Sequence, residues 1–246
     1  MQHIEWESHR VWSSGIRWFH WINVVTVLAL IGSGLVIYNG KALGIAAEGK
    51  ILMKTLHVWA GYLFALNLLW RLLQAFTGNR YARWGAVLPF RRGYLSELGR
   101  YVQSLRRGEP RHYLGHNPLG RLMITLLLLL LASQAVTGLV LAGTDLYYPP
   151  LGGWIASWVA PTGVDPGTLV AGDKSMVDAA AWEAMREFRA PFIGLHVQGF
   201  FVLLAAVLLH VVGVVVGEFR ERSGLVSAMI TGEKKLGGRP VDRNGE

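Results

Sequence analysis

Two histidines, His196 and His210, lie fourteen residues apart in the run GLHVQGFFVLLAAVLLHVVG, which is otherwise apolar. Fourteen residues of α-helix turn through about 1400° and rise about 21 Å, so both imidazoles lie on one helix face, one near each end. Ionisable side chains are costly within a bilayer and are usually functional there. A neutral imidazole that binds a metal ion avoids this cost, so the spacing indicates metal ligation if partner ligands exist.

Two further histidines, His20 and His57, lie in other apolar runs of the chain. If the N-terminus is cytoplasmic, as the distribution of basic residues predicts, His57 and His196 lie near the outer surface of the membrane, and His20 and His210 lie toward its inner surface. Two axial imidazoles from facing helices complete the coordination of a haem iron and leave no open position for catalysis. We therefore predict that these histidines ligate two haems, in the pairs His20/His210 and His57/His196, and we predict no catalytic residue.

A single histidine within an apolar helix has a second explanation. Its imidazole can hydrogen-bond a neighbouring helix and serve packing alone. This explanation stays open for each histidine considered separately, whereas four histidines in two pairs of matched depth favour ligation and, with it, electron conduction.

The elements that would position these histidines are four apolar stretches, each close to the roughly 20 residues needed to cross a bilayer. They cover residues of about 16–38, 55–76, 119–143 and 192–217. The first stretch is too long for the apolar core of a signal peptide and shows no small-residue cleavage site, so we keep it as a helix. The sequence thus predicts an all-α membrane protein, a four-helix transmembrane bundle that forms a single domain over residues 1–246.

The net charge of +8 arises largely from arginines and lysines that flank these stretches. Basic residues gather in 77–118 and 218–246, so the positive-inside rule predicts a cytoplasmic loop, a cytoplasmic tail and a cytoplasmic N-terminus. Residues 144–191 carry an acidic excess and are predicted as a periplasmic loop, whereas the lysines of 39–54 are a small counter-signal. Anionic lipid headgroups are a simpler partner for the flanking arginines than nucleic acid.

Two segments outside the four stretches show helical patterns. RRGYLSELGRYVQSLRRG predicts an amphipathic helix on the cytoplasmic membrane surface, with arginines near lipid phosphates. SMVDAAAWEAMREF predicts a short helix within the periplasmic loop.

The chain contains no cysteine. This excludes iron–sulfur clusters held by thiolates, disulfides, and haem attachment through a C-x-x-C-H motif. Cysteine content does not indicate the redox compartment here.

Arg71 is the one charged residue well within a span, fourteen residues after His57 and therefore on the same helix face. This register places Arg71 near the inner haem, where its guanidinium matches the geometry of a propionate carboxylate. Arg17, three residues before His20, is a second candidate for the same role. Both arginines could instead extend to the cytoplasmic headgroups.

The chain resembles the membrane cytochrome b subunits of nickel–iron hydrogenases, within the wider bacterial cytochrome b561-like and formate dehydrogenase gamma-subunit superfamily. The resemblance rests on RWFHWINVVTVLALIGSGL, LHVWAGYLFALNLLWRLLQAFTGNRY, GHNPLGR, LHVQGFF through LLHVVG, and the tail SGLVSAMITGEK. It implies two b haems, with ligands at the positions of His20 with His210 and of His57 with His196. It also implies a respiratory-chain subunit of the bacterial inner membrane that passes electrons between a periplasmic redox partner and quinone.

The motif GHNPLGR lies beside the inner haem in this resemblance, which makes His116 and Asn117 quinone candidates. Asn117 could donate a hydrogen bond to a quinone carbonyl, and His116 could pass a proton. The same residues also fit a helix start, with Asn117 as the N-cap and Pro118 at the first helical position.

The predicted periplasmic loop is longer than the hydrogenase subunits require, so a hydrogenase, another dehydrogenase and a c-type cytochrome are all candidate partners. Membrane lipid and quinone complete the expected partners, a homodimer is left open, and nucleic acid is not expected. The sequence predicts an electron-transfer subunit of a quinone-linked oxidoreductase and leaves its own enzymatic activity open. One alternative is a self-sufficient superoxide:quinone oxidoreductase of the b561 type, and a second is a haem-free transporter or proton path that uses the histidines directly.

Overall fold

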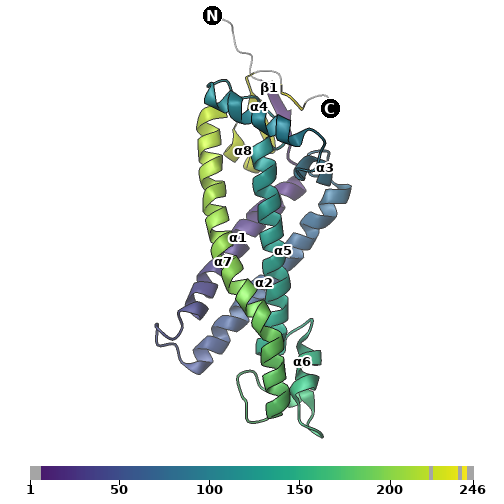
Figure 1. The fold of residues 1–246 in the computed structure, drawn as a ribbon, viewed down its shortest axis with the longest axis vertical. Coiled ribbons are helices and arrows are strands. Elements are labelled where there is room, and N and C mark those ends of the chain that lie inside the picture. Colours follow the sequence, from purple (N-terminus) through teal and green to yellow (C-terminus); the bar gives the residue numbers. More distant parts are fainter. Residues whose placement is uncertain (1–6, 222–223, 238–239, 243–246) are drawn as a thin grey trace, which may run out of the picture. The chain divides into compact units, whose positions relative to one another are not determined.

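Four long helices dominate the computed structural model, which describes residues 7–221, 224–237 and 240–242. They are α1 (Ser14–Tyr38), α2 (Ala47–Thr77), α5 (Pro118–Leu146) and α7 (Ala179–Glu221) (Figure 1). Their lengths are 25, 31, 29 and 43 residues, and each is apolar enough to be a candidate membrane span. The four predicted apolar stretches therefore form four helices.

The long helices expose large apolar side chains along much of their length. Leu28, Leu66, Leu129 and Leu208 are 62%, 66%, 66% and 60% exposed. A protein surrounded by water rarely exposes so much contiguous apolar surface. These faces are suited to contact lipid, as expected for helices that cross a bilayer.

Two helices begin earlier than the apolar pattern predicts. α2 begins at Ala47 and α7 at Ala179, so both extend outside the apolar stretches from which they were predicted. The prediction of SMVDAAAWEAMREF as a separate helix was wrong, because its last ten residues, 179–188, form the first part of α7, which continues through Pro191. Proline lacks a backbone N–H, yet helices in membranes tolerate it where neighbouring groups satisfy the freed carbonyl.

The chain divides into two compact units, and each long helix contributes residues to both. Unit 1 comprises the described parts of Met1–Trp21, Leu68–Leu129 and Leu203–Glu246. Unit 2 comprises Ile22–Asn67 and Leu130–Val202. The shorter elements of unit 1 are α3 (Trp84–Val87), α4 (Tyr94–Arg106), α8 (Leu225–Thr231), β1 (Glu7–Arg10) and β2 (Glu233–Leu236), and those of unit 2 are α6 (Gly152–Val159) and the 3-10 helix η1 (Pro166–Thr168).

In unit 1 the two ends of the described chain form a small antiparallel sheet. Glu7 of β1 pairs with Leu236 of β2, and Arg10 pairs with Glu233. In Figure 1 the purple strand β1 lies beside the yellow C-terminal segment. Beneath the sheet a core gathers side chains from distant parts of the sequence: Val11, Trp12, Ile16, Ala82, Leu114, Ala228 and Leu236.

The predicted amphipathic segment of unit 1 forms α4, and tyrosines attach it to the long helices. The Tyr94 hydroxyl donates to the Pro118 carbonyl at 2.7 Å, at the start of α5. The Tyr101 hydroxyl donates to Glu221 Oε1 at 2.5 Å, at the end of α7. On the same helix Leu95 is 79% exposed, so α4 presents an apolar residue outward as well.

In unit 2 one carboxylate connects three of the long helices. Asp145 of α5 accepts from Arg189 Nε of α7 and from Lys54 Nζ of α2, each at 2.6 Å. The short helix α6 packs on the first part of α7 through Ile155, Val159 and Met185, all of which are buried. These contacts hold α2, α5, α6 and α7 together within unit 2.

Candidate functional site

His57 of α2 and His196 of α7 face each other in unit 2. Their ring centroids lie 6.2 Å apart, with an angle of 79° between the ring planes. A metal–imidazole bond is about 2 Å long and the ring centre lies about 1 Å beyond the nitrogen, so two imidazoles on opposite sides of one metal place their centroids about 6 Å apart. The spacing of His57 and His196 matches that arrangement.

The hydroxyl of Ser33 on α1 determines which nitrogen of His57 carries a proton. Ser33 Oγ lies 2.7 Å from the Ala29 carbonyl oxygen, to which it donates, and 2.8 Å from His57 Nδ1. A hydroxyl has a single proton to donate. Ser33 Oγ must therefore accept from His57 Nδ1–H, and Nε2 is left with the lone pair that a metal requires.

Thr137 of α5 does the same for His196. Thr137 Oγ1 donates to the Ser133 carbonyl oxygen at 2.7 Å and lies 2.9 Å from His196 Nδ1. His196 Nδ1–H therefore donates to Thr137 Oγ1, and Nε2 is again unprotonated. In the described part of the chain no hydrogen bond engages either Nε2 atom. Partners of this kind, behind the ligating ring, commonly orient metal-bound histidines.

Sequence reasoning missed Ser33 and Thr137, although one signal could have found them. Each hydroxyl residue is followed by a glycine, Gly34 or Gly138, on the helix that faces the histidine. A Cβ atom on Gly34 would lie 3.5 Å from His57 Cε1, and one on Gly138 would lie 3.4 Å from His196 Cε1. The imidazoles thus pack directly over the two glycines, which lets the preceding hydroxyls reach Nδ1.

The second pair, His20 of α1 and His210 of α7, lies in unit 1. The two imidazoles are near enough to interact electrostatically. His20 Nδ1 is buried without a hydrogen-bond partner among the described residues, and the ring contacts Trp21 edge-on with centroids 5.2 Å apart. The structure therefore brings His20 and His210 into one neighbourhood but gives His20 no hydroxyl partner of the kind found in unit 2.

The spacing of His57 and His196 fits a metal whose other ligands come from a macrocycle. Among the described residues, no three of the histidine, aspartate and glutamate side chains come together as a metal site. Tetrahedral zinc sites built from protein ligands alone need three or four such groups. Two opposed imidazoles instead supply the two axial positions of a haem iron.

The two arginines predicted to neutralise propionates differ in their surroundings. Arg71 is 5% exposed, and its Nη1 is buried without a hydrogen-bond partner among the described residues. Arg17 donates through Nη1 to the Ile230 carbonyl oxygen at the end of α8, although its Nε is buried without a partner. Arg71 is therefore available for a buried anion, whereas Arg17 is partly committed to holding α8.

The two predicted quinone residues also differ. Asn117 accepts from the Gly120 N–H at 2.7 Å and donates to Tyr101 Oη at 2.7 Å and to Glu221 Oε1 at 3.2 Å. It therefore caps α5, which begins at Pro118, and both its amide groups are engaged.

His116 packs on Trp12 with ring centroids 4.7 Å apart, and its Nδ1 is buried without a partner among the described residues. Burial, followed by the positive charges of Lys234, Arg71 and Arg121 and by His210, lowers the pKa of His116 to about 3. His116 is therefore neutral at physiological pH, and its Nδ1 remains available to a ligand.

Comparison with known proteins gives matches over almost the whole chain. The profile of the prokaryotic cytochrome b561 family matches residues 11–232. A probable Ni/Fe-hydrogenase B-type cytochrome subunit of Rhizobium leguminosarum bv. viciae is 32% identical over 247 residues, which cover 94% of this chain and 90% of the relative. The subunit of the same description from Bradyrhizobium diazoefficiens is 29% identical, covering 92% of this chain and 85% of the relative.

A probable Ni/Fe-hydrogenase 1 B-type cytochrome subunit of Escherichia coli K12 is 30% identical over 145 residues, which cover 54% of this chain and 60% of the relative. No solved structure matches the chain significantly. The sequence likeness thus extends over both pairs of histidines, because the matched residues 11–232 include all four.

Proposed function

The chain belongs to the prokaryotic cytochrome b561 family, and on this basis we propose that it is a dihaem cytochrome that conducts electrons between a periplasmic redox partner and quinone. It is a multi-pass protein of the bacterial inner membrane, a b-type cytochrome that takes part in electron transfer and binds haem b. Our proposal adds to this the number of haems, their ligands, the redox partner and the use of quinone.

The observation that carries the proposal is the arrangement of His57 and His196. Their rings lie 6.2 Å apart, and hydroxyl groups hold both Nδ1 atoms, so that both Nε2 atoms keep a free lone pair. Haem iron held in this way supplies one-electron exchange and no open coordination position. The helices α2 and α7 thus position a redox centre, and Ser33 and Thr137 keep its ligands in the required tautomer.

We assign the second haem to His20 and His210 in unit 1. The support is that both lie in the same unit, within electrostatic reach of each other, on helices α1 and α7. α7 carries one histidine of each pair, fourteen residues apart, which is about 21 Å along the helix. One helix therefore supplies a ligand at two levels.

We assign residues 77–118 and 218–246 to the cytoplasmic side and residues 144–191 to the periplasmic side. The surface of residues 90–106 supports this orientation, because the exposed apolar residues Phe90 and Leu95 stand beside the exposed arginines Arg91, Arg92 and Arg100. Apolar side chains next to arginines suit the boundary between acyl chains and anionic headgroups.

The partner that we propose is a nickel–iron hydrogenase on the periplasmic side. The support comes from two relatives described as hydrogenase B-type cytochrome subunits, each of which matches over 90% of this chain. Another dehydrogenase or a c-type cytochrome is an alternative outcome of the co-purification described below.

We place quinone near His116 in unit 1. Its Nδ1 is buried and unpartnered among the described residues, whereas the amide of Asn117 already makes three hydrogen bonds. We therefore infer that His116 contacts a quinone carbonyl and that Asn117 supports the site by capping α5. In this role His116 provides a hydrogen-bonding nitrogen, since it is neutral at physiological pH.

The test is a haem count with an optical spectrum on protein purified in mild detergent from haem-replete cells. We expect two haems b per chain in the wild type and one in each of the variants H57A and H210A. The reduced spectrum of the haem that remains in H57A should differ from that of the haem that remains in H210A. H9A serves as the control, because His9 lies in β1 next to Glu7 and should not change the count. A colourless wild type overturns the proposal, and an unchanged count in H210A overturns the pairing in unit 1. The proteins that co-purify with the wild type identify the partner.

A further inference from the structure

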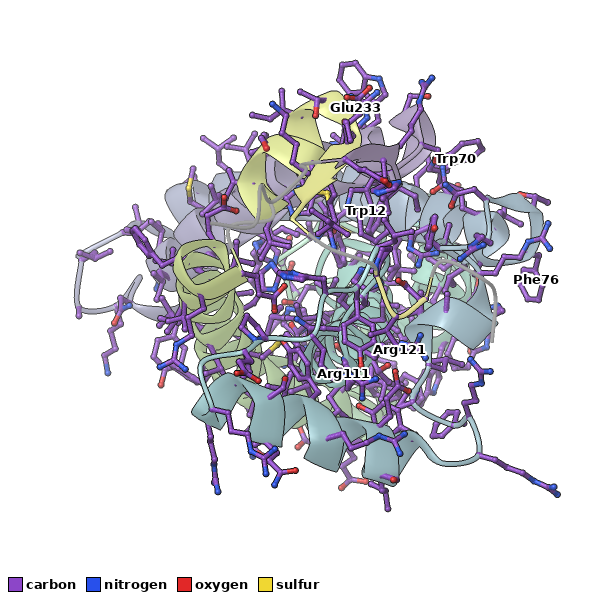
Figure 2. The ribbon with its side chains drawn as sticks, turned by 90° about the horizontal axis from the view of Figure 1, so that it is seen from above. Trp12, Trp70, Phe76, Arg111, Arg121 and Glu233 are labelled. Atoms are coloured by element: carbon purple, nitrogen blue, oxygen red, sulfur yellow. The ribbon has the colours of Figure 1, made fainter. Side chains whose placement is uncertain are left out.

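Two arginines of unit 1 are buried with unused hydrogen-bond donors. Arg71 of α2 is 5% exposed and Arg121 of α5 is 8% exposed. Nη1 of Arg71, and both Nε and Nη1 of Arg121, are buried with no hydrogen-bond partner among the described residues. Figure 2 shows Arg121 among the inner side chains of the view, whereas Phe76 lies at its periphery. Arg121 belongs to the motif GHNPLGR, in which sequence reasoning weighed only His116 and Asn117.

No described carboxylate neutralises these two guanidinium groups. Neither arginine forms an ion pair in the part of the chain that the structure describes. Glu221 accepts from Tyr101 and Asn117, and Asp242 accepts from the backbone N–H groups of Leu114 and Gly115. An arginine stays charged inside a protein, and a buried charge without a partner is strongly unfavourable. The two side chains are therefore arranged for an anion that the chain itself does not supply.

The position of this charge indicates the anion. Arg71 and Arg121 both act electrostatically on the His116 imidazole, and so does His210. Both guanidinium groups therefore lie within electrostatic range of His116, as does His210, which is one of the proposed haem ligands. Lys234, the third cation near His116, already donates to the carbonyl oxygens of Tyr113 at 3.2 Å and Gly115 at 2.9 Å. The two arginines are consequently the cations of this group that have donors free.

We propose that Arg71 and Arg121 together bind the propionate carboxylates of the haem that His20 and His210 hold. This inference rests on the proposed function and assigns the anion of the unit 1 site. Arginine matches a carboxylate with two parallel N–H donors, so two arginines provide for both carboxylates of one haem. Arg17, the alternative from the sequence, is less suited because its Nη1 donates to Ile230.

The test compares R71Q and R121Q with the wild type in a redox titration that resolves the two haems. Loss of a positive charge near the iron disfavours the added electron, so each variant should lower the midpoint potential of the haem that is lost in H210A. The potential of the other haem should stay unchanged and reports that the variant is folded. R71K and R121K keep the charge without the planar fork and should shift the potential less. R100Q is the matched control, because Arg100 is an exposed arginine of the same unit.

The haem count separates this inference from the proposed function. A wild type without haem overturns both, whereas two haems whose potentials are the same in R71Q, R121Q and R100Q overturn the propionate assignment alone. An anionic lipid headgroup is the other anion that a pair of arginines could bind. Native mass spectrometry that shows a phospholipid lost in R71Q and R121Q, with both potentials unchanged, assigns the site to lipid and overturns the proposal.

Discussion

Removal of the hydroxyl behind a ligating histidine should weaken haem binding in unit 2. The variants S33A and T137V each take away the acceptor of one Nδ1–H, at 2.8 Å from His57 and 2.9 Å from His196 in the wild type. A donor left unsatisfied in a buried site costs about 1–3 kcal/mol, and the loss of a partner behind a metal ligand typically weakens binding about 10-fold to 100-fold. We therefore expect each variant to bind the haem of unit 2 about 10-fold to 100-fold less tightly.

The expected loss can be measured as the transfer of haem to an excess of apomyoglobin, with the count and spectrum of the haem that remains. The haem held by His20 and His210 should transfer at the wild-type rate, which makes it an internal reference. T26A and T144V are matched controls, because Thr26 of α1 and Thr144 of α5 are buried hydroxyl residues that bond backbone carbonyls of their own helices. If S33A and T137V retain this haem as tightly as T26A and T144V do, the tautomer argument is refuted.

Three further substitutions test polar contacts within the two units. Y101F removes a buried hydrogen bond to the Glu221 carboxylate and should lower the free energy of unfolding by about 1.5–3 kcal/mol. The loss should appear as a lower Tm and as faster trypsin cleavage at residues 106–107. An unchanged Tm contradicts the role of this contact. D145N removes the negative charge that pairs with Arg189 and should destabilise unit 2 by a similar amount. On heating, the haem of unit 2 should be lost at a lower temperature than in the wild type. An unchanged temperature of haem loss excludes a stabilising ion pair. Burial lowers the pKa of Lys234 to about 8 against about 10.5 when unfolded, so the unfolded chain binds more protons between these pH values and stability should rise by about 3 kcal/mol across them. Denaturation in detergent at pH 7.5 and 9.5, which cover part of this interval, should show a rise of about 2 kcal/mol in the wild type but not in K234M, and an equal rise in K234M would falsify the assignment.

The sequence was sufficient for the features that depend on neighbouring residues. The four apolar stretches form the four long helices, and the spacing of His196 and His210 places both on one continuous helix. The cap at Asn117 and Pro118 could also be read locally, because capping involves residues within one turn. Local patterns were less reliable at the helix ends, because α7 begins at Ala179 and continues through Pro191, whereas the apolar pattern predicted a span that begins at residue 192.

The parts of the site that the sequence did not reveal are contacts between residues far apart in the chain. Ser33 meets His57 across 24 positions, Thr137 meets His196 across 59, and Tyr101 meets Glu221 across 120. Pairing of β1 with β2 joins the two ends of the described chain. The residue pattern within one segment of such a pair does not indicate which distant residue it will contact.

The sequence by itself determined where the helices lie and which faces carry histidines, because helix geometry repeats every few residues and apolar length sets a membrane span. The tertiary structure decided which nitrogen of His57 and His196 is free, and that Arg121 is buried without a counter-ion among the described residues. The physical reason is that a hydroxyl proton already given to its own helix makes the oxygen an acceptor for the histidine of another helix. Such an arrangement exists only after the helices have packed, since packing alone sets the distance between them.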